Sequence, residues 1–284
     1  MVRIKLYVVT YDNDQILIDN ALSSLAESVI PPSLGVSLEC TVINNFGRLC
    51  LPERFSNISV VDNLLRPDRS TGHLARNWNQ SIMLGFGDLR NPECDILVHV
   101  QNDARLVPNW IENLLRHHSR HDFFQYGRGD EFCSYTVDAV RNIGLWDERF
   151  CYITHQESDY LLRAALHGKG RVSINDSNGV HHRLFQPVPA EEGLLDLSVP
   201  CGAQRKDGIN HRNPSFAYGI TENLFHRKYR LIMDDAHVYL RPRYWGTTLL
   251  KNLDRVVLGD HQPMLYPHFE KDVLSPYASP YLQA

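Results

Sequence analysis

The sequence lacks the long apolar runs and the leader segment that would place a protein in or across a membrane. No apolar run approaches the roughly 20 residues that a membrane-spanning helix needs. Residues 2–10 carry an arginine and a lysine within an apolar pattern, which indicates a first strand and not a signal peptide. We therefore expect a soluble, cytoplasmic protein, either bacterial or encoded by a virus and kept in the cytoplasm of its host.

Closely spaced cysteines, excess positive charge and internal repeats are also absent from the sequence. Its six cysteines are scattered and have no spacing typical of a metal site, so we expect reduced thiols and neither a disulfide nor a zinc framework. The formal net charge of −4 argues against a dedicated nucleic-acid-binding protein. With 284 residues, the chain is long enough for one large domain and a sizeable appendage.

Strand and helix patterns alternate over the first 115 residues. Short β-branched apolar runs are followed by stretches whose apolar residues recur at helical spacing. This alternation predicts an α/β fold in which a mostly parallel central sheet is flanked by helices on both faces. The strands are expected at residues 4–10, 36–43, 58–61 and 95–100.

The pattern changes after residue 120. We expect further strands at 132–137 and 171–174, with a helix between them that begins near Glu157. In the last third of the chain prolines are frequent and helical periodicity survives only in places. The sequence therefore predicts one domain over residues 1–185 and a helical and loop extension, packed on that domain, over residues 186–284.

Polar residues follow three of the predicted strands at the point where each strand ends. In an open α/β sheet these carboxyl ends form a rim, and ligands bind at that rim. Amides, an aromatic ring and a carboxylate on one rim are suited to holding a nucleotide, and the alternative is that they are ordinary turn residues. Asp103 is suited to holding a divalent cation against phosphate oxygens, or it caps the helix that follows. The three segments are Thr10-Tyr11-Asp12, Asn44-Asn45 and Gln101-Asn102-Asp103.

Two carboxylates lie at the predicted start of a later helix. Glu157 and Asp159 are favoured there in their ionised form by the helix dipole, and an ionised carboxylate beside a cleft can take a proton from a hydroxyl nucleophile. Because they are two residues apart, they diverge by about 200° around the helix, so only one can face the cleft. The other is expected to brace the helix or pair with Arg163, four residues on. The alternative is an acidic first turn that only stabilises the helix.

Two further histidines, His181 and His182, follow a glycine near a predicted strand end. A histidine there is suited to ligating a metal or contacting a diphosphate. The alternative is an ordinary pair of surface histidines, which the fourteen histidines of the chain make easy to find by chance.

Seven short segments form an ordered set of motifs that resembles the GT-A glycosyltransferases, in particular the large family-2-like group that uses nucleotide-diphosphate sugars. Each motif alone is degenerate, and the specificity comes from their order. The resemblance covers residues 3–185. The segments are Val8-Val9-Thr10-Tyr11, Val42-Ile43-Asn44-Asn45-Phe46-Gly47, Gly72-His73-Leu74-Ala75-Arg76-Asn77, Val100-Gln101-Asn102-Asp103, Gly144-Leu145-Trp146-Asp147-Glu148-Arg149-Phe150, Gln156-Glu157-Ser158-Asp159-Tyr160 and Gly179-Val180-His181.

The resemblance implies a GT-A fold, with a donor half over residues 1–115 and an acceptor half over residues 116–185. It predicts an inverting hexosyl- or pentosyltransferase that moves a sugar from a nucleotide-diphosphate donor, most commonly a UDP-sugar, to a hydroxyl of a glycan or glycoconjugate. Glu157 stands where the family has its catalytic aspartate, so it is the expected general base, with Asp159 as the second candidate.

The other site residues that the resemblance implies fall into three groups. Asp103 and His181 are expected to hold Mn²⁺ or Mg²⁺. Trp146, Asp147, Tyr126 and Arg128 are expected to contact the acceptor, with Trp146 as an apolar platform for a sugar ring. The donor is expected to contact Thr10, Tyr11, Asp12, Asn44, Arg76, Asn77, Gln101 and Asn102.

The sequence departs from the family pattern at three places. Gln101 replaces the first acid of the D-x-D motif, which leaves Asp103 as its only carboxylate and makes a metal-independent enzyme an alternative. Asn44 stands in place of the usual aspartate, and Glu157 is one methylene longer than the usual catalytic residue. Three other functions stay open: a retaining GT-A enzyme, a nucleotide-sugar- or glycan-binding module that has lost catalysis, and a nucleotidyltransferase, which would release pyrophosphate.

Overall fold

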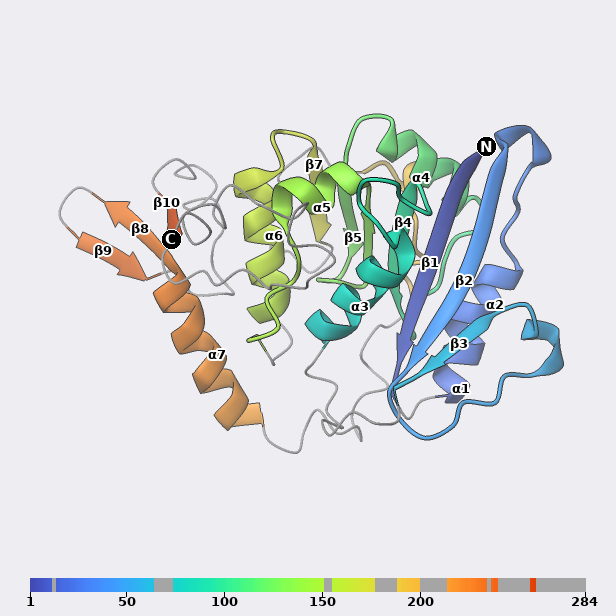
Figure 1. Ribbon diagram of the computed structural model, residues 1–284, viewed down its shortest axis with the longest axis horizontal. Coiled ribbons are helices and arrows are strands. Elements are labelled where there is room, and N and C mark those ends of the chain that lie inside the picture. The colour runs from blue at the N-terminus through green and yellow to red at the C-terminus, as the bar shows by residue number, and fades with distance from the viewer. Residues whose placement is uncertain are drawn as a thin grey trace.

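A seven-stranded sheet forms the centre of the protein (Figure 1), seen in a computed structural model that describes residues 1–11, 14–63, 74–150, 155–176, 188–199, 214–233, 236–239 and 256–258. The strand order is β3-β2-β1-β4-β6-β5-β7. β6 runs antiparallel to its neighbours β4 and β5, and the other pairs are parallel. The strands are β1 (Val2–Thr10), β2 (Val36–Asn44), β3 (Ser59–Asp62), β4 (Ile96–Gln101), β5 (Phe123–Gly127), β6 (Phe132–Tyr135) and β7 (Val172–Asp176).

Helices cover both faces of this sheet. The α1 and α2 helices, joined by a π-helix at Ile18–Leu22, lie on one face with α4, and α3, α5 and α6 lie on the other (Figure 1). The predicted α/β class, with a mostly parallel sheet between helices, is confirmed. None of the helices in the described part of the chain is long and apolar enough to cross a membrane. Their bounds are α1 (Asp14–Leu17), α2 (Ser23–Ala26), α3 (Leu74–Phe86), α4 (Trp110–His118), α5 (Val137–Ile143) and α6 (His155–His167).

Alternating residues of the central strands fill the two cores. In β1, Tyr7 and Val9 belong to the core under α3, α5 and α6, whereas Leu6 and Val8 belong to the core under α1, α2 and α4. Successive side chains of a strand point to opposite faces, so a strand that is covered on both sides reads as a continuous apolar run. This is why the sequence pattern located these strands within one or two residues.

The C-terminal region adds elements that the sequence only partly predicted. Helix α7 (Pro214–Lys228) packs on the core through Leu224 and Phe225, which are buried with residues of α6. A three-stranded antiparallel sheet follows, with the order β10-β8-β9. The sequence predicts only helices and loops here, because its helical periodicity runs on to Tyr229, where β8 begins, so the small sheet corrects that prediction. Its strands are β8 (Tyr229–Met233), β9 (Ala236–Tyr239) and β10 (Val256–Leu258).

A buried histidine sits in the middle of the sheet. The ring of His99 in β4 is 0% exposed and stacks on Trp78, with ring centroids 4.6 Å apart. Its Nε2 lies 2.6 Å from the hydroxyl of Ser81, which donates to the carbonyl oxygen of Trp78. The Ser81 oxygen therefore accepts from Nε2–H, so the neutral ring carries its proton on Nε2. Burial holds the pKa of His99 well below its usual value.

Acidification is therefore expected to destabilise the fold through His99. Below its unfolded pKa of about 6.5, the unfolded state binds a proton that the folded state excludes, so stability falls as the pH decreases. The loss approaches about 1.4 kcal/mol per pH unit. In urea unfolding between pH 7 and 5, the variant His99→Phe, which keeps an aromatic ring against Trp78, should show a shallower pH dependence. An identical slope in both proteins would assign the acid sensitivity to other groups.

Candidate functional site

The ends of three strands lie side by side at one rim of the sheet, as the sequence predicted. Thr10 is in register with Asn44 of β2, and Val9 is in register with Gln101 of β4. The side-chain amide of Asn102 donates to the hydroxyl of Thr10 at 3.2 Å, and the backbone N–H of Asn45 donates to the carbonyl of Thr10 at 3.1 Å. Thr10 therefore links the three strand ends.

The residues around Tyr11 give this rim an aromatic edge. Its ring lies 5.4 Å from the ring of Phe46, between centroids, and Phe46 is one of the few exposed large hydrophobic residues. Asn44 is fully buried, and its amide donates to the carbonyl of Gly47 at 2.9 Å and to Asp62 at 2.7 Å. Asn44 thus braces the turn that carries Phe46. Asp12, another predicted donor contact, lies outside the described residues.

Asp103 and Gln101 lie at the end of β4, and both are buried. The side-chain amide of Gln101 donates to Asp130, in the turn between β5 and β6, and the indole N–H of Trp78 donates to the other oxygen of Asp130 at 2.7 Å. The position of the missing D-x-D acid is therefore occupied by an amide that holds a carboxylate from the turn between β5 and β6. The sequence gives no local signal for this pairing, because residues 101 and 130 are distant in the chain.

The turn between β5 and β6 also carries the contact to Glu157. Gly129 in this turn has a φ of +59°, and a Cβ placed on it would lie 2.5 Å from Oε2 of Glu157. The carboxylate of Glu157 therefore lies directly over Gly129, next to Asp130, which holds Gln101. The end of β4 at Gln101, two residues before Asp103, and the carboxylate of Glu157 thus contact the same turn.

Two buried residues that the sequence analysis missed hold this turn in shape. The amide of Gln125 in β5 donates to the carbonyls of Gly127 at 3.1 Å and Gly129 at 2.6 Å. The carboxylate of Glu131 accepts from the backbone N–H of Arg128 at 2.8 Å. A glutamine within the apolar run of β5, just before two glycines, is the signal that would have found Gln125. These bonds explain why the turn has one defined conformation under Glu157.

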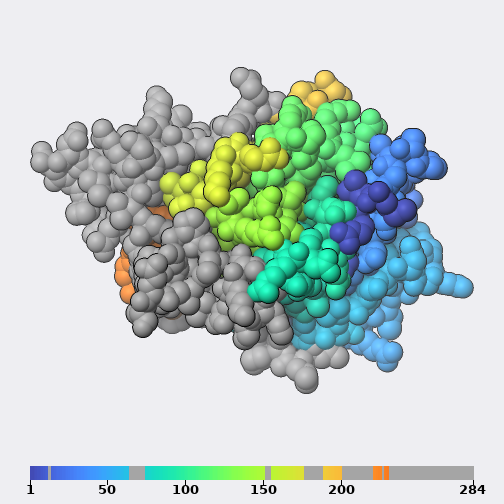
Figure 2. Space-filling view, turned by 45° about the horizontal axis from the view of Figure 1, so that its top comes forward, coloured from blue at the N-terminus to red at the C-terminus, as the bar shows by residue number. Residues whose placement is uncertain are grey.

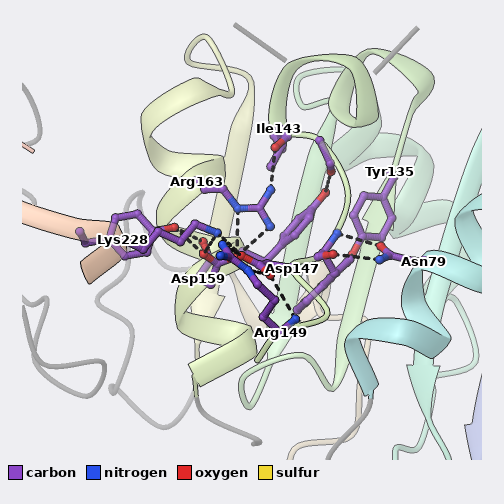
Figure 3. Close-up of polar contacts among 12 residues, drawn as sticks. Asn79, Tyr135, Ile143, Asp147, Arg149, Asp159, Arg163 and Lys228 are labelled. Carbon is purple, nitrogen blue, oxygen red and sulfur yellow. Dashed lines mark hydrogen bonds and ion pairs between the residues drawn. The ribbon is translucent and has the colours of Figure 1, made fainter. Parts of the chain in front are cut away.

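Asp159 does not face the rim, and its expected role as a second general base is corrected. Its side chain is 1% exposed and forms an ion pair with Arg163 at 2.8 Å (Figure 3). Lys228 of α7 lies 2.5 Å from its other oxygen. The predicted divergence of the two acids is confirmed, because Glu157 is half-buried over the turn while Asp159 pairs with Arg163 inside the core.

The expected acceptor contacts at Trp146 and Asp147 are also corrected. Trp146 is 0% exposed and stacks on Tyr160, with ring centroids 4.2 Å apart, so it offers no face to a sugar. Its backbone N–H and carbonyl are both bound by the side chain of Asn79 at 2.8 Å (Figure 3). Asp147 is buried and pairs with Arg149 at 2.7 Å and with Lys228 at 2.8 Å. The segment serves to join α3, α6 and α7.

The remaining predicted residues are spread along the rim and the adjoining helix. Arg128 is half-buried and donates to the carbonyls of residues 197 and 199 at 3.2 and 3.1 Å. Tyr126 is 8% exposed, and Asn77 in the first turn of α3 is 6% exposed. Arg76 forms an ion pair with Glu148 at 3.3 Å. Helix α5 lies beside α3 and the loop that follows it, as the green and teal residues of Figure 2 show. Arg141 of α5 donates to the carbonyl of Leu89 in that loop at 2.7 Å.

A metal at this rim would depend on few protein ligands. Within the described ranges, no group of three or more His, Cys, Asp or Glu side chains is placed to hold an ion. The amide nitrogen of Gln101 points at Asp130, and His181 lies outside the described residues. Mg²⁺ is commonly held by one or two carboxylates together with substrate phosphates. Asp103 therefore fits a cation that binds together with a diphosphate.

Comparison with known proteins finds similarity in structure alone. The structure of S. aureus TarS matches with a TM-score of 0.45 and 13% identity, over 67% of this chain and 38% of that chain. S. aureus TarS 1–349 in complex with UDP-GlcNAc has a TM-score of 0.41 and 13% identity, over 62% and 56% of the two chains. The mannosyltransferase PcManGT from Pyrobaculum calidifontis, in complex with GDP-Man and Mn²⁺, has a TM-score of 0.38 and 12% identity, over 62% and 55%.

This chain therefore spans less than two thirds of the length of each of these three structures. Neither the protein-family models nor the curated proteins give a match.

Proposed function

We propose that the protein is an inverting glycosyltransferase that moves a sugar from a nucleotide-diphosphate donor, a UDP-sugar in the first instance, to a hydroxyl of a glycan acceptor. The observation that supports this most is the position of the half-buried Glu157 carboxylate over Gly129, on the same turn that holds Gln101 at the end of β4, two residues before Asp103. A single carboxylate beside a rim suited to a nucleotide has the geometry of a general base next to a bound donor.

The residues act in the following order. The nucleotide binds along the rim, with its base beside Tyr11 and Phe46 and its diphosphate near Asp103. Glu157 takes the proton of an acceptor hydroxyl, whose oxygen attacks the anomeric carbon. The bond from that carbon to the diphosphate oxygen breaks, and the nucleoside diphosphate leaves with the electron pair. Because this is one displacement from the opposite face, the anomeric configuration inverts, and NMR of the anomeric proton in the product distinguishes inversion from retention.

A divalent cation bound with the donor would neutralise charge that develops on the leaving diphosphate. Asp103 would hold it, with His181 as a second proposed ligand. The carboxylate of Asp130 accepts hydrogen bonds from Gln101 and Trp78. Its proposed role is therefore to fix the position of Gln101 at the end of β4.

Asp103→Asn is expected to weaken donor binding by about 10- to 100-fold, in line with the 1.5–3 kcal/mol of a lost charge-assisted contact. Titration calorimetry with a nucleotide sugar, with and without Mn²⁺, measures this change. The matched control is Asp138→Asn, an exposed acid on α5 that pairs with Arg141. If binding by the wild-type protein is the same in Mn²⁺ and in EDTA, Asp103 does not work through a metal.

A binding module that has lost catalysis is the second candidate function. It is favoured by Gln101 and Asn44, the two residues that stand in place of acids of the family motifs. The side chains of both form hydrogen bonds within the protein. A donor that binds and is never turned over would support this candidate and exclude the transferase.

A further inference from the structure

Four charged side chains form a buried ion cluster between the start of α6 and the end of α7. Asp147 and Asp159 are each 1% exposed, and Arg163 and Lys228 are 0% exposed. The ammonium of Lys228 lies 2.8 Å from Asp147 and 2.5 Å from Asp159, while Arg163 pairs with Asp159 at 2.8 Å (Figure 3). The hydroxyl of Tyr229, the residue after Lys228, donates to Asp159 at 2.6 Å.

Lys228 compensates the negative charges of Asp147 and Asp159, which lie close together inside the protein. Burial opposes the ionisation of Asp147 and of Asp159, and the negative charge of Asp147 further opposes the ionisation of Asp159. Lys228 contacts both, and with Arg149 and Arg163 it outweighs burial, so the pKa of each carboxyl is held below its usual value. Removal of one partner from a buried ion pair is strongly destabilising because the remaining charge is left unpaired.

A second bond joins α7 to α6 on the other side of Glu157. The hydroxyl of Thr221 in α7 lies 2.9 Å from Nδ1 of His155, the first residue of α6, and both side chains are 0% exposed. Between Thr221 and Lys228, the apolar side chains of α7 are packed into the core that contains α6. Helix α7 thus holds α6 at residues 155 and 159, which lie two residues before and two residues after Glu157.

We propose that helix α7 is a positioning element of the site, with Lys228 and Thr221 as the residues that fix the first turn of α6 and so hold Glu157 over Gly129. The C-terminal region is then a part of the catalytic unit and not an appendage of it. This inference rests on the proposed role of Glu157 as the general base. It requires no contact between α7 and the substrate.

The test uses the full chain with two substitutions, Lys228→Met and Thr221→Val. If α7 positions Glu157, each folded variant should lose kcat while the KM for the donor stays at the wild-type value. A misplacement of about 1 Å at a reacting group reduces the rate by as much as about 100-fold. We expect a loss of this order for Lys228→Met and a smaller loss for Thr221→Val. Lys5→Met, which removes the ion pair between Lys5 of β1 and Glu93, is the control for loss of a paired lysine.

A merely structural role for the ion cluster would give a different result. It would lower the melting temperature of Lys228→Met, with full kcat in whatever fraction stays folded, and this outcome would overturn the proposal. If Lys228→Met does not fold, Thr221→Val decides alone, because valine has nearly the shape of threonine.

Hydrogen exchange separates this inference from the proposed function. In Lys228→Met and Thr221→Val, amide exchange should increase in residues 155–163 and stay unchanged in β1 and β2. If the wild-type protein transfers no sugar, the proposed function fails, yet faster exchange in 155–163 would still support the bracing of this turn by α7. Unchanged exchange in that segment would overturn it whether or not the protein is an enzyme.

Discussion

Glu157→Gln is expected to reduce the rate of sugar transfer by about 10²- to 10⁴-fold, the usual contribution of a positioned general base. Glutamine has nearly the same shape as glutamate but takes up no proton from a hydroxyl. The donor binds at the rim of the sheet, so its affinity should be unchanged. Initial rates measured with saturating donor and acceptor, together with calorimetry on the same preparation, give both quantities.

The neighbouring acid provides the comparison for this variant. Asp159→Asn should lower stability and, through the position of Glu157, also kcat, because Asp159 pairs with Arg163 and Lys228 inside the protein. It should lower the melting temperature far more than Glu157→Gln does. Full transfer activity in Glu157→Gln, or loss of activity without loss of stability in Asp159→Asn, would contradict the assignment of the two acids.

Gly129→Ala is expected to reduce kcat by up to about 100-fold by moving the Glu157 carboxylate. The added Cβ would lie 2.5 Å from Oε2, whereas ordinary contacts begin at 3.4 Å, so the carboxylate must shift by about 1 Å. The end of a glutamate side chain can make this shift at little energetic cost. The loss of activity should therefore exceed what the change in stability explains, and both are measured on one sample by initial rates and urea unfolding.

Gly35→Ala is the matched control for this variant. Gly35 has a φ of +58°, against +59° at Gly129, and a Cβ placed on it would have no atom within 4 Å. Alanine in this conformation costs about 1–2 kcal/mol at either position. The two variants should therefore lose similar stability, and only Gly129→Ala should lose activity. Equal activities in the two variants would show that Glu157 does not work from the position seen over Gly129.

The fold could be predicted from the sequence because its information is local. Strand Ile96–Gln101 and the second half of Val2–Thr10 are buried on both faces, so these stretches are mostly apolar and end sharply in polar residues. The antiparallel direction of β6 and the small C-terminal sheet could not be read in this way. Both depend on how distant segments pair, which the periodicity of a single segment does not record.

The site could be predicted only where a residue's role follows from its position in its own element. The opposite directions of Glu157 and Asp159 follow from helix geometry alone, and the rim at Thr10 follows from the parallel strands. The motif predicts acceptor contacts for Trp146 and Asp147, and the structure buries both. Trp146 is buried against Tyr160 of α6, and Asp147 is paired with Lys228 of α7. Lys228 has no local sequence pattern that would reveal its pairing with two carboxylates.

The release of products from nucleotide sugars tests the central claim most directly. The protein is incubated with a panel that includes UDP-GlcNAc and GDP-mannose, with a glycan acceptor and Mn²⁺, and the nucleotide products are separated by chromatography. The account predicts that at least one sugar donor yields its nucleoside diphosphate, and that Glu157→Gln stops this release while still binding the donor. Release of pyrophosphate, or release of nucleoside diphosphate at an equal rate by Glu157→Gln, would contradict it.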